Sequence, residues 1–173
     1  MNKLAVILGL LMIVLPPARG QTKNGRWAKV EASLKEQISK EMPEWTCRFF
    51  EPVPEGDVII YHCELGDILL EIAVIEYQND ERAEALFKET KAELKRQEEI
   101  ATKNQGKEVK LVKEDLSNLG DEGYVFVVRG SEAVAFRKAR FLVNISVPRP
   151  DDNKDVFFSR KFAQHAANAL EDR

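Results

Sequence analysis

Residues 58–77, VIIYHCELGDILLEIAVIEY, predict an antiparallel β-hairpin. Gly66-Asp67 is a two-residue turn signal between two apolar-rich segments. A turn at that point pairs Leu65 with Ile68, Cys63 with Leu70 and His62 with Glu71. Because side chains alternate between the two faces of a strand, one face should be core and the other at least partly wet. The expected core face carries Ile59, Tyr61, Cys63, Leu70, Ile72 and Val74, and the wet face carries His62, Glu64, Glu71 and Ala73.

A third strand is predicted on the N-terminal side of this hairpin, at about residues 45–52. A loop centred on Glu55 places Cys47 opposite Cys63, close enough for a disulfide bond. The same register puts Phe49 on the core face, and Arg48 and Phe50 on the wet face. The chain holds two cysteines, and an even count in an oxidising compartment favours a disulfide. The alternatives are a metal pair or a reactive thiol, and neither has a CxxC spacing or a nearby second histidine to support it.

The remaining elements follow from hydrophobic periodicity. Helices are expected at 26–42, at 80–102 with Asn79 or Asp80 as its cap, and at 154–171. Strands are expected at 108–116 and 124–129, with a turn at Gly130-Ser131. Residues 132–147 are either one very long strand or two strands bent at Lys138-Ala139, and typical strand lengths favour two. One face of this second region is apolar: Val125, Val127, Val134, Phe136, Phe141, Val143, Ile145 and Val147.

The resulting fold class is α+β, with antiparallel β-sheet in the meander order α-β-β-β-α-β-β-β-β-α and helices packed on the sheet. Residues 21–173 make one domain, long enough for a substantial core. No linker or repeat divides it.

The first twenty residues predict a cleaved secretory signal peptide. Lys3 precedes an apolar run from Leu4 to Leu15, and Ala18-Arg19-Gly20 forms a cleavage site before Gln21. A transmembrane anchor is the competing interpretation, but about twelve apolar residues fall short of the roughly twenty that span a bilayer. The expected location is therefore outside the cytoplasm, in a bacterial periplasm or medium, with no stable membrane anchor after cleavage.

Charge argues against nucleic acid as a partner. The full chain has a net charge of −3, and loss of Lys3 and Arg19 leaves 24 basic and 29 acidic residues, a net charge of −5. A mildly acidic protein is a poor candidate for nucleic acid or an anionic membrane surface. No cofactor is expected. Two histidines without an HxxxH, HExxH or CxxC motif also predict no dedicated metal site.

The first candidate site is a polar row of Arg48, His62 and Glu71 across three strands. A histidine oriented by a carboxylate begins a general-base arrangement, although the pattern sets no serine or threonine beside it. The alternative is a cross-strand ion and hydrogen-bond row on a solvated face. His165, beside the apolar stripe of the last helix, is a second candidate whose usual role would be structural.

The third candidate is a basic turn of Arg137, Lys138 and Arg140, expected near Arg160 and Lys161. Such a turn can hold a carboxylate, phosphate or acidic head group, or simply protect an edge strand. Residues 119–124, LGDEGY, predict a tight glycine loop whose Asp121 and Glu122 lack EF-hand spacing for calcium. Tyr124, Phe126, Ala135 and Leu142 share the second face, where they either line an apolar cleft under a helix or pack there.

The C-terminal half resembles exported bacterial sensor-like domains. Residues 119–124 (LGDEGY), 136–143 (FRKARFLV) and 166–170 (AANAL) carry the resemblance. It points to the extracytoplasmic sensor domain of PknH-type kinases and to related lipoproteins of the PsbP-like class. This chain has Gly123 where those proteins often have alanine, Ala139 where they often have glycine, and no lipid-attachment cysteine. The resemblance implies an antiparallel sheet flanked by helices, with a cleft, and a binding or sensing role without catalytic residues.

The expected function is therefore non-enzymatic binding of a small molecule, lipid or protein outside the cytoplasm. The second hypothesis is a hydrolase-like enzyme that uses His62 with Glu71, which would require a buried cleft and a nucleophile. The third is an interaction or inhibitor module, which a large exposed apolar patch would favour.

Overall fold

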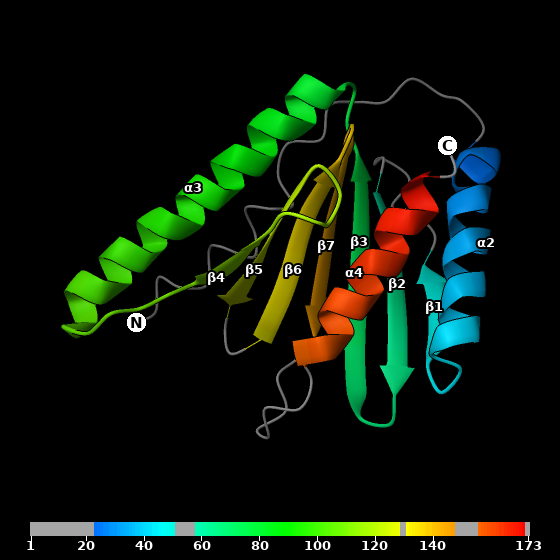
Figure 1. Ribbon diagram of the computed structural model, residues 1–173, viewed down its shortest axis with the longest axis horizontal. Coiled ribbons are helices and arrows are strands. Elements are labelled where there is room, and N and C mark those ends of the chain that lie inside the picture. Colours follow the sequence, from blue (N-terminus) through cyan, green and yellow to red (C-terminus); the bar gives the residue numbers. More distant parts are fainter. Residues whose placement is uncertain (1–22, 51–57, 129–130, 148–155, 172–173) are drawn as a thin grey trace.

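The computed structural model describes residues 23–50, 58–128, 131–147 and 156–171, so the predicted signal peptide and the loop at 52–57 lie outside the described residues. The predicted element order and the α+β class are confirmed (Figure 1). The elements are α2 (Lys23–Glu41), β1 (Thr46–Phe50), β2 (Val58–Leu65), β3 (Ile68–Glu76), α3 (Asp80–Gln105), β4 (Val112–Leu116), β5 (Glu122–Val128), β6 (Ser131–Lys138), β7 (Phe141–Val147) and α4 (Val156–Glu171).

All the described strands form one seven-stranded antiparallel sheet in the order β1-β2-β3-β7-β6-β5-β4. Two meanders, β1–β3 and β4–β7, therefore meet along a seam between β3 and β7. The seam pairs Glu71 with Ser146 and Ala73 with Asn144. Its two strands are separated in sequence by α3 and the rest of the second meander.

The predicted register of the first meander is correct. Cys47 pairs with Cys63, His62 with Glu71, and Leu65 with Ile68. The two cysteines form a disulfide with Cα atoms 4.0 Å apart. This is close to the spacing of directly opposed residues in a non-hydrogen-bonded pair.

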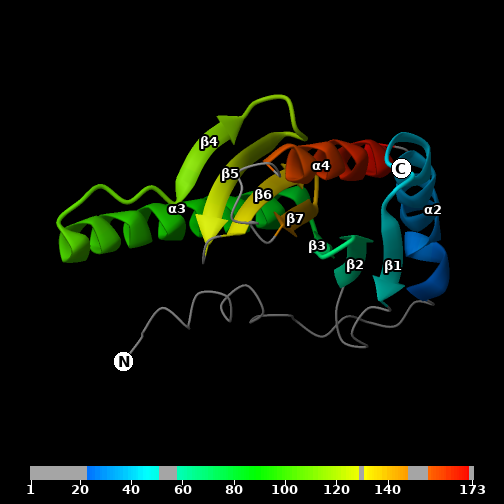
Figure 2. The ribbon, with the colours of Figure 1, turned by 90° about the horizontal axis from the view of Figure 1, so that it is seen from below.

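Helices cover the two faces of the sheet unequally. The main core lies between one sheet face and the pair α2 and α4, which lie side by side (Figure 1). Edge-to-face contacts of Trp45 with Phe158 and Phe162, at centroid distances of 5.2 and 4.9 Å, tie α4 to the start of β1. A smaller cluster lies under α3, which lies on the opposite side of the sheet from α4 (Figure 2). Its members are Phe87, Leu94, Tyr124, Phe126 and Ala133.

The long helix α3 is capped as its sequence predicts. The Asn79 side chain accepts a hydrogen bond from the Arg82 N–H at 2.8 Å, and Gly106 ends the helix in the left-handed conformation. Beyond it, β4 begins at Val112 rather than at 108. The reason is that α3 itself satisfies the preceding backbone: Glu98 Oε1 accepts from the N–H groups of Leu111 and Val112, at 2.6 and 2.5 Å.

One predicted turn is wrong by a single residue. Val128 pairs with Ser131, so Ser131 lies within β6 and the β5–β6 connection is 129–130, not Gly130-Ser131. The shift changes the cross-strand pairing by two residues, which leaves every side chain on its predicted face. Residues 132–147 do form two strands, and Lys138 pairs with Phe141 across the turn.

Both edges of the sheet carry charge. Arg48 lies at the middle of edge strand β1, and Lys113, Glu114 and Asp115 follow one another along β4, where the register shifts between Val112 and Glu114. Charges and irregular pairing on edge strands oppose edge-to-edge association. None of the helices in the described ranges is long and apolar enough to span a membrane.

Candidate open-face site

One half of the second sheet face has no described helix packed over it. α3 packs on β4, β6 and β7 and runs outward past β4, away from the first meander (Figure 1). Glu64, Leu69 and Glu71 on the uncovered half are exposed, with Leu69 41% exposed. We call this surface the open face. It consists of Arg48, Val58, Ile60, His62, Glu64, Leu69, Glu71, Ala73 and Ile75.

The predicted polar row crosses the open face. The cross-strand pairs Arg48–His62 and His62–Glu71 place the three residues side by side. His62 Nε2 lies 3.0 Å from Glu71 Oε2, with the side chains 30% and 47% exposed. Arg48 is exposed and forms no ion pair with another residue in the described part of the chain. The row therefore presents one guanidinium that is not paired with any carboxylate of the described residues.

The β3–β7 seam extends this row to a residue that the sequence pattern did not reveal. Ser146 lies opposite Glu71. Strand alternation alone puts Ser146 on the second face, but only the seam brings it beside Glu71. Because neighbouring strands are about 4.8 Å apart, a residue on β7 lies roughly 10 Å from His62 on β2. That separation is beyond hydrogen-bond reach, so Ser146 and His62 do not form a nucleophile–base pair.

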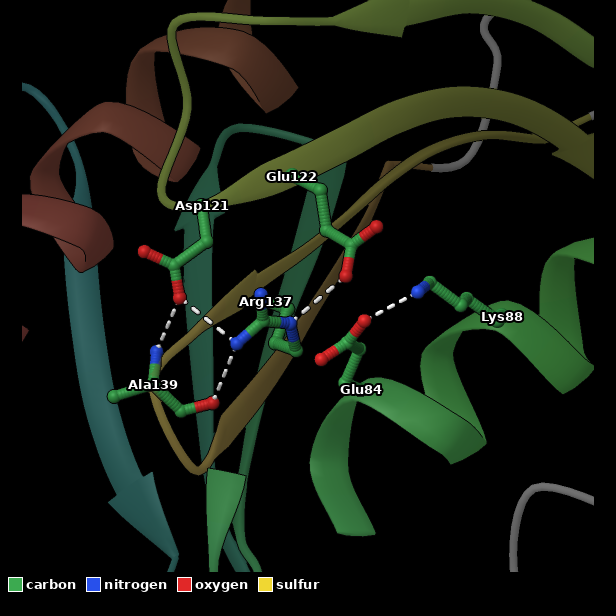
Figure 3. A network of polar contacts seen from close by, with 6 residues as sticks. All are labelled: Glu84, Lys88, Asp121, Glu122, Arg137 and Ala139. Atoms are coloured by element: carbon green, nitrogen blue, oxygen red, sulfur yellow. Dashed lines mark hydrogen bonds and ion pairs between the residues drawn. The ribbon is translucent and has the colours of Figure 1, made fainter. Parts of the chain in front are cut away.

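The basic turn is held by carboxylates of its own chain. Arg137 Nε donates to Glu122 Oε1 at 2.8 Å, and its Nη1 lies 2.9 Å from Asp121 Oδ2 (Figure 3). Asp121 Oδ2 also accepts from the Ala139 N–H at 2.7 Å, while the Asp121 N–H donates to the Arg137 carbonyl at 2.8 Å. We call Asp121, Glu122, Arg137 and Ala139 the clamp. It fastens the loop before β5 onto the β6–β7 turn.

The other basic residues near the turn are also engaged. Arg140 Nε lies 2.6 Å from Glu76 Oε1, whose side chain is fully buried, and its guanidinium lies over the Phe141 ring. Lys138 has interactions of its own. Arg160, predicted to lie near the turn, instead pairs with Glu114 on β4 at 2.5 Å. The turn is thus tied into the fold through ion pairs.

Tyr124 and Phe126, the predicted aromatic ligand contacts, are 1% and 6% exposed. The Tyr124 ring packs against Phe87 of α3 at a centroid distance of 5.1 Å and against Phe126 at 5.5 Å. Ala135 and Leu142 pack against the same cluster. Of the two alternatives, cleft or packing, the structure shows packing, and these rings are not available to a ligand. Within the described ranges, no three His, Cys, Asp or Glu side chains are grouped to hold a metal ion.

His165 lies between α4 and α2, with its side chain 4% exposed. Its Nδ1 is 3.3 Å from Gln37 Oε1, and its Nε2 is 3.8 Å from Glu41 Oε2. Burial lowers the pKa of His165, the Glu41 carboxylate opposes that effect, and Lys161 adds to it. The neutral ring is therefore the form that this helix interface favours.

We expect His165 to make the protein less stable in mild acid. A histidine whose pKa is lower in the folded state than the ordinary value of about 6.5 binds its proton more readily after unfolding. Stability should therefore fall as the pH drops below about 6.5. Urea unfolding of the wild type and of His165→Asn, from about pH 7.5 to about pH 5.5, measures this loss. A wild-type curve no steeper with pH than that of His165→Asn would contradict the assignment.

Comparisons with known proteins add one fold-level similarity. No family model matches the sequence, and no curated protein matches it. The chain is similar to the crystal structure of a GTP-binding regulator from Thermotoga maritima, with a TM-score of 0.46 and 11% sequence identity, over 83% of this chain and 87% of the other. At this level the similarity supports no inference about activity.

Proposed function

We propose that this protein is an exported, non-catalytic binding protein, and that the open face is its binding surface. The observation that carries the proposal is the uneven covering of the sheet: α2 and α4 cover one face, while α3 covers only the second meander on the other. Apolar side chains that remain exposed or partly exposed on one face of a sheet favour an interaction surface there.

The composition of the open face supports binding rather than catalysis. Leu69 is exposed, and Ile60 and Ile75 are partly buried, so all three offer apolar area to a partner. The available Arg48 guanidinium supplies a directional donor that matches carboxylates. His62 and Glu71 are solvent-accessible, and no described hydroxyl nucleophile stands opposite His62 in the strand register. The sensor-like role implied by the resemblance of residues 119–170 agrees with this proposal.

Native mass spectrometry of the protein produced with its leader and purified from a periplasm tests the proposal. We expect the N-terminus to be Gln21 and the native mass to exceed the denatured mass, because a partner remains bound. Arg48→Ala should reduce the bound fraction. Lys95→Ala, which removes an exposed cation from α3, is the matched control and should not change it.

Two outcomes would contradict the proposal. A native mass equal to the denatured mass would show that no partner is retained. An excess mass that Arg48→Ala and Lys95→Ala affect equally would place binding away from the open face.

A further inference from the structure

We infer that the partner of the open face is a second copy of this chain, so that two first meanders pack face to face. This inference rests on the proposed function, because it assigns an occupant to the same surface. Two sheets pack in this way at about 10 Å, with strand directions within roughly 30° of each other. A closed pair of identical chains uses one self-complementary patch on both partners.

The charges on the open face select one symmetric arrangement. In it, the two-fold axis lies between the sheets, parallel to the strands, and passes between β2 and β3. Each cross-strand row then faces the same row of the second copy with the strand order reversed. His62 faces Glu71 of the second copy, and Glu71 faces its His62. Arg48 faces Ser146 of the second copy, a hydroxyl able to accept its hydrogen bond.

Three other symmetric arrangements bring like charges together or move Glu71 away from His62 of the second copy. An axis along β2 sets Glu64 against Glu64 of the second copy. An axis along the polar row, perpendicular to the strands, sets Arg48 against Arg48 of the second copy. Moving that axis half a row toward Ile60 sets Glu71 against Ala73 of the second copy. Like-charge contacts across an interface oppose association, so charge complementarity favours the axis between β2 and β3.

The apolar residues of the open face complete the same arrangement. Ile60 then faces Ala73 of the second copy, and Val58 faces Ile75. Leu69 lies against the aliphatic part of Glu64 of the second copy. The Glu64 carboxylate stays at the end of β2, beside the exposed residues of the Gly66-Asp67 turn. This arrangement therefore buries the Leu69 side chain while the Glu64 carboxylate stays in contact with water.

Sedimentation velocity over a concentration series tests the inference. We expect the sedimentation coefficient of the wild type to correspond to a mass of two chains. Ala73→Arg places an unpaired cation at the centre of the interface and should weaken association about tenfold or more. Ala92→Arg, the same substitution at an exposed position of α3, is the control and should associate like the wild type.

A second variant guards against loss of folding in Ala73→Arg. Glu71→Arg alone should weaken association because it faces His62 of the second copy, and adding His62→Glu should restore it. A wild type that stays at the mass of one chain at its highest soluble concentration would overturn the inference. If native mass spectrometry then shows an excess that is not a whole chain, the proposed binding function stands without the dimer. If it shows no excess, both fail.

Discussion

Replacing Gly120 with alanine should lower the free energy of unfolding by about 3 kcal/mol or more. Gly120 has φ +63°, and a Cβ there would lie 2.3 Å from the Arg137 carbonyl oxygen. The left-handed conformation costs a residue with a Cβ about 1–2 kcal/mol, and overpacking costs typically about 1–3 kcal/mol more. The contacted atom belongs to the backbone of β6, so relief requires the loop to move away and the clamp to open.

Gly106→Ala separates these two contributions. Gly106 has nearly the same conformation, φ +66°, but a Cβ there would meet nothing within 4 Å. It should cost only the backbone penalty, about 1–2 kcal/mol. Urea unfolding of both variants measures the difference. Equal losses would mean that the close approach of Gly120 to Arg137 does not stabilise the fold.

Removing the disulfide with Cys47→Ala and Cys63→Ala together should cost about 3 kcal/mol, because the bond restricts the unfolded chain. The bonded cysteines are 16 residues apart in sequence. For a domain of this size, such a loss lowers Tm by roughly 6–12 °C. Cys63 is completely buried, so its truncation adds a small packing loss to the loss of the cross-link.

Reduction of the wild type provides the control for this prediction. A reductant should lower the Tm of the wild type toward that of the double-alanine variant and leave the variant unchanged. If complete reduction, checked by thiol titration, leaves the wild-type Tm unaltered, the bond contributes no net stability.

The first meander was predictable because three independent constraints agree there. The Gly66-Asp67 turn sets the β2–β3 register, the period-two pattern assigns the faces, and the cysteine spacing fixes β1 against β2. All three concern residues close in sequence, where turn chemistry and alternation are informative. The same reasoning separated β6 from β7, although it placed the β5–β6 turn one residue late.

The β3–β7 seam was not predictable, because nothing local distinguishes which strand of one meander joins the other. The open face follows from that seam and from the path of α3. Partners of the basic turn were missed for a related reason. Glu122 lies directly opposite Arg137 in the β5–β6 ladder, a pairing hidden by the turn predicted one residue late. Asp121 reaches Arg137 from the loop before β5, and Arg140 contacts Glu76 across the seam.

The contact of Trp45 with α4 has a consequence for the order of folding. Trp45, which leads into β1, packs against Phe158 and Phe162 of α4, so the N-terminal meander lacks part of its cover until α4 has been synthesised. The β3–β7 seam also cannot form until β7 has been synthesised, and pairings between segments distant in sequence form slowly. A growing chain therefore cannot complete this core until α4 has been synthesised. A delay of this kind is compatible with the export proposed above, in which the chain would cross a membrane before it folds.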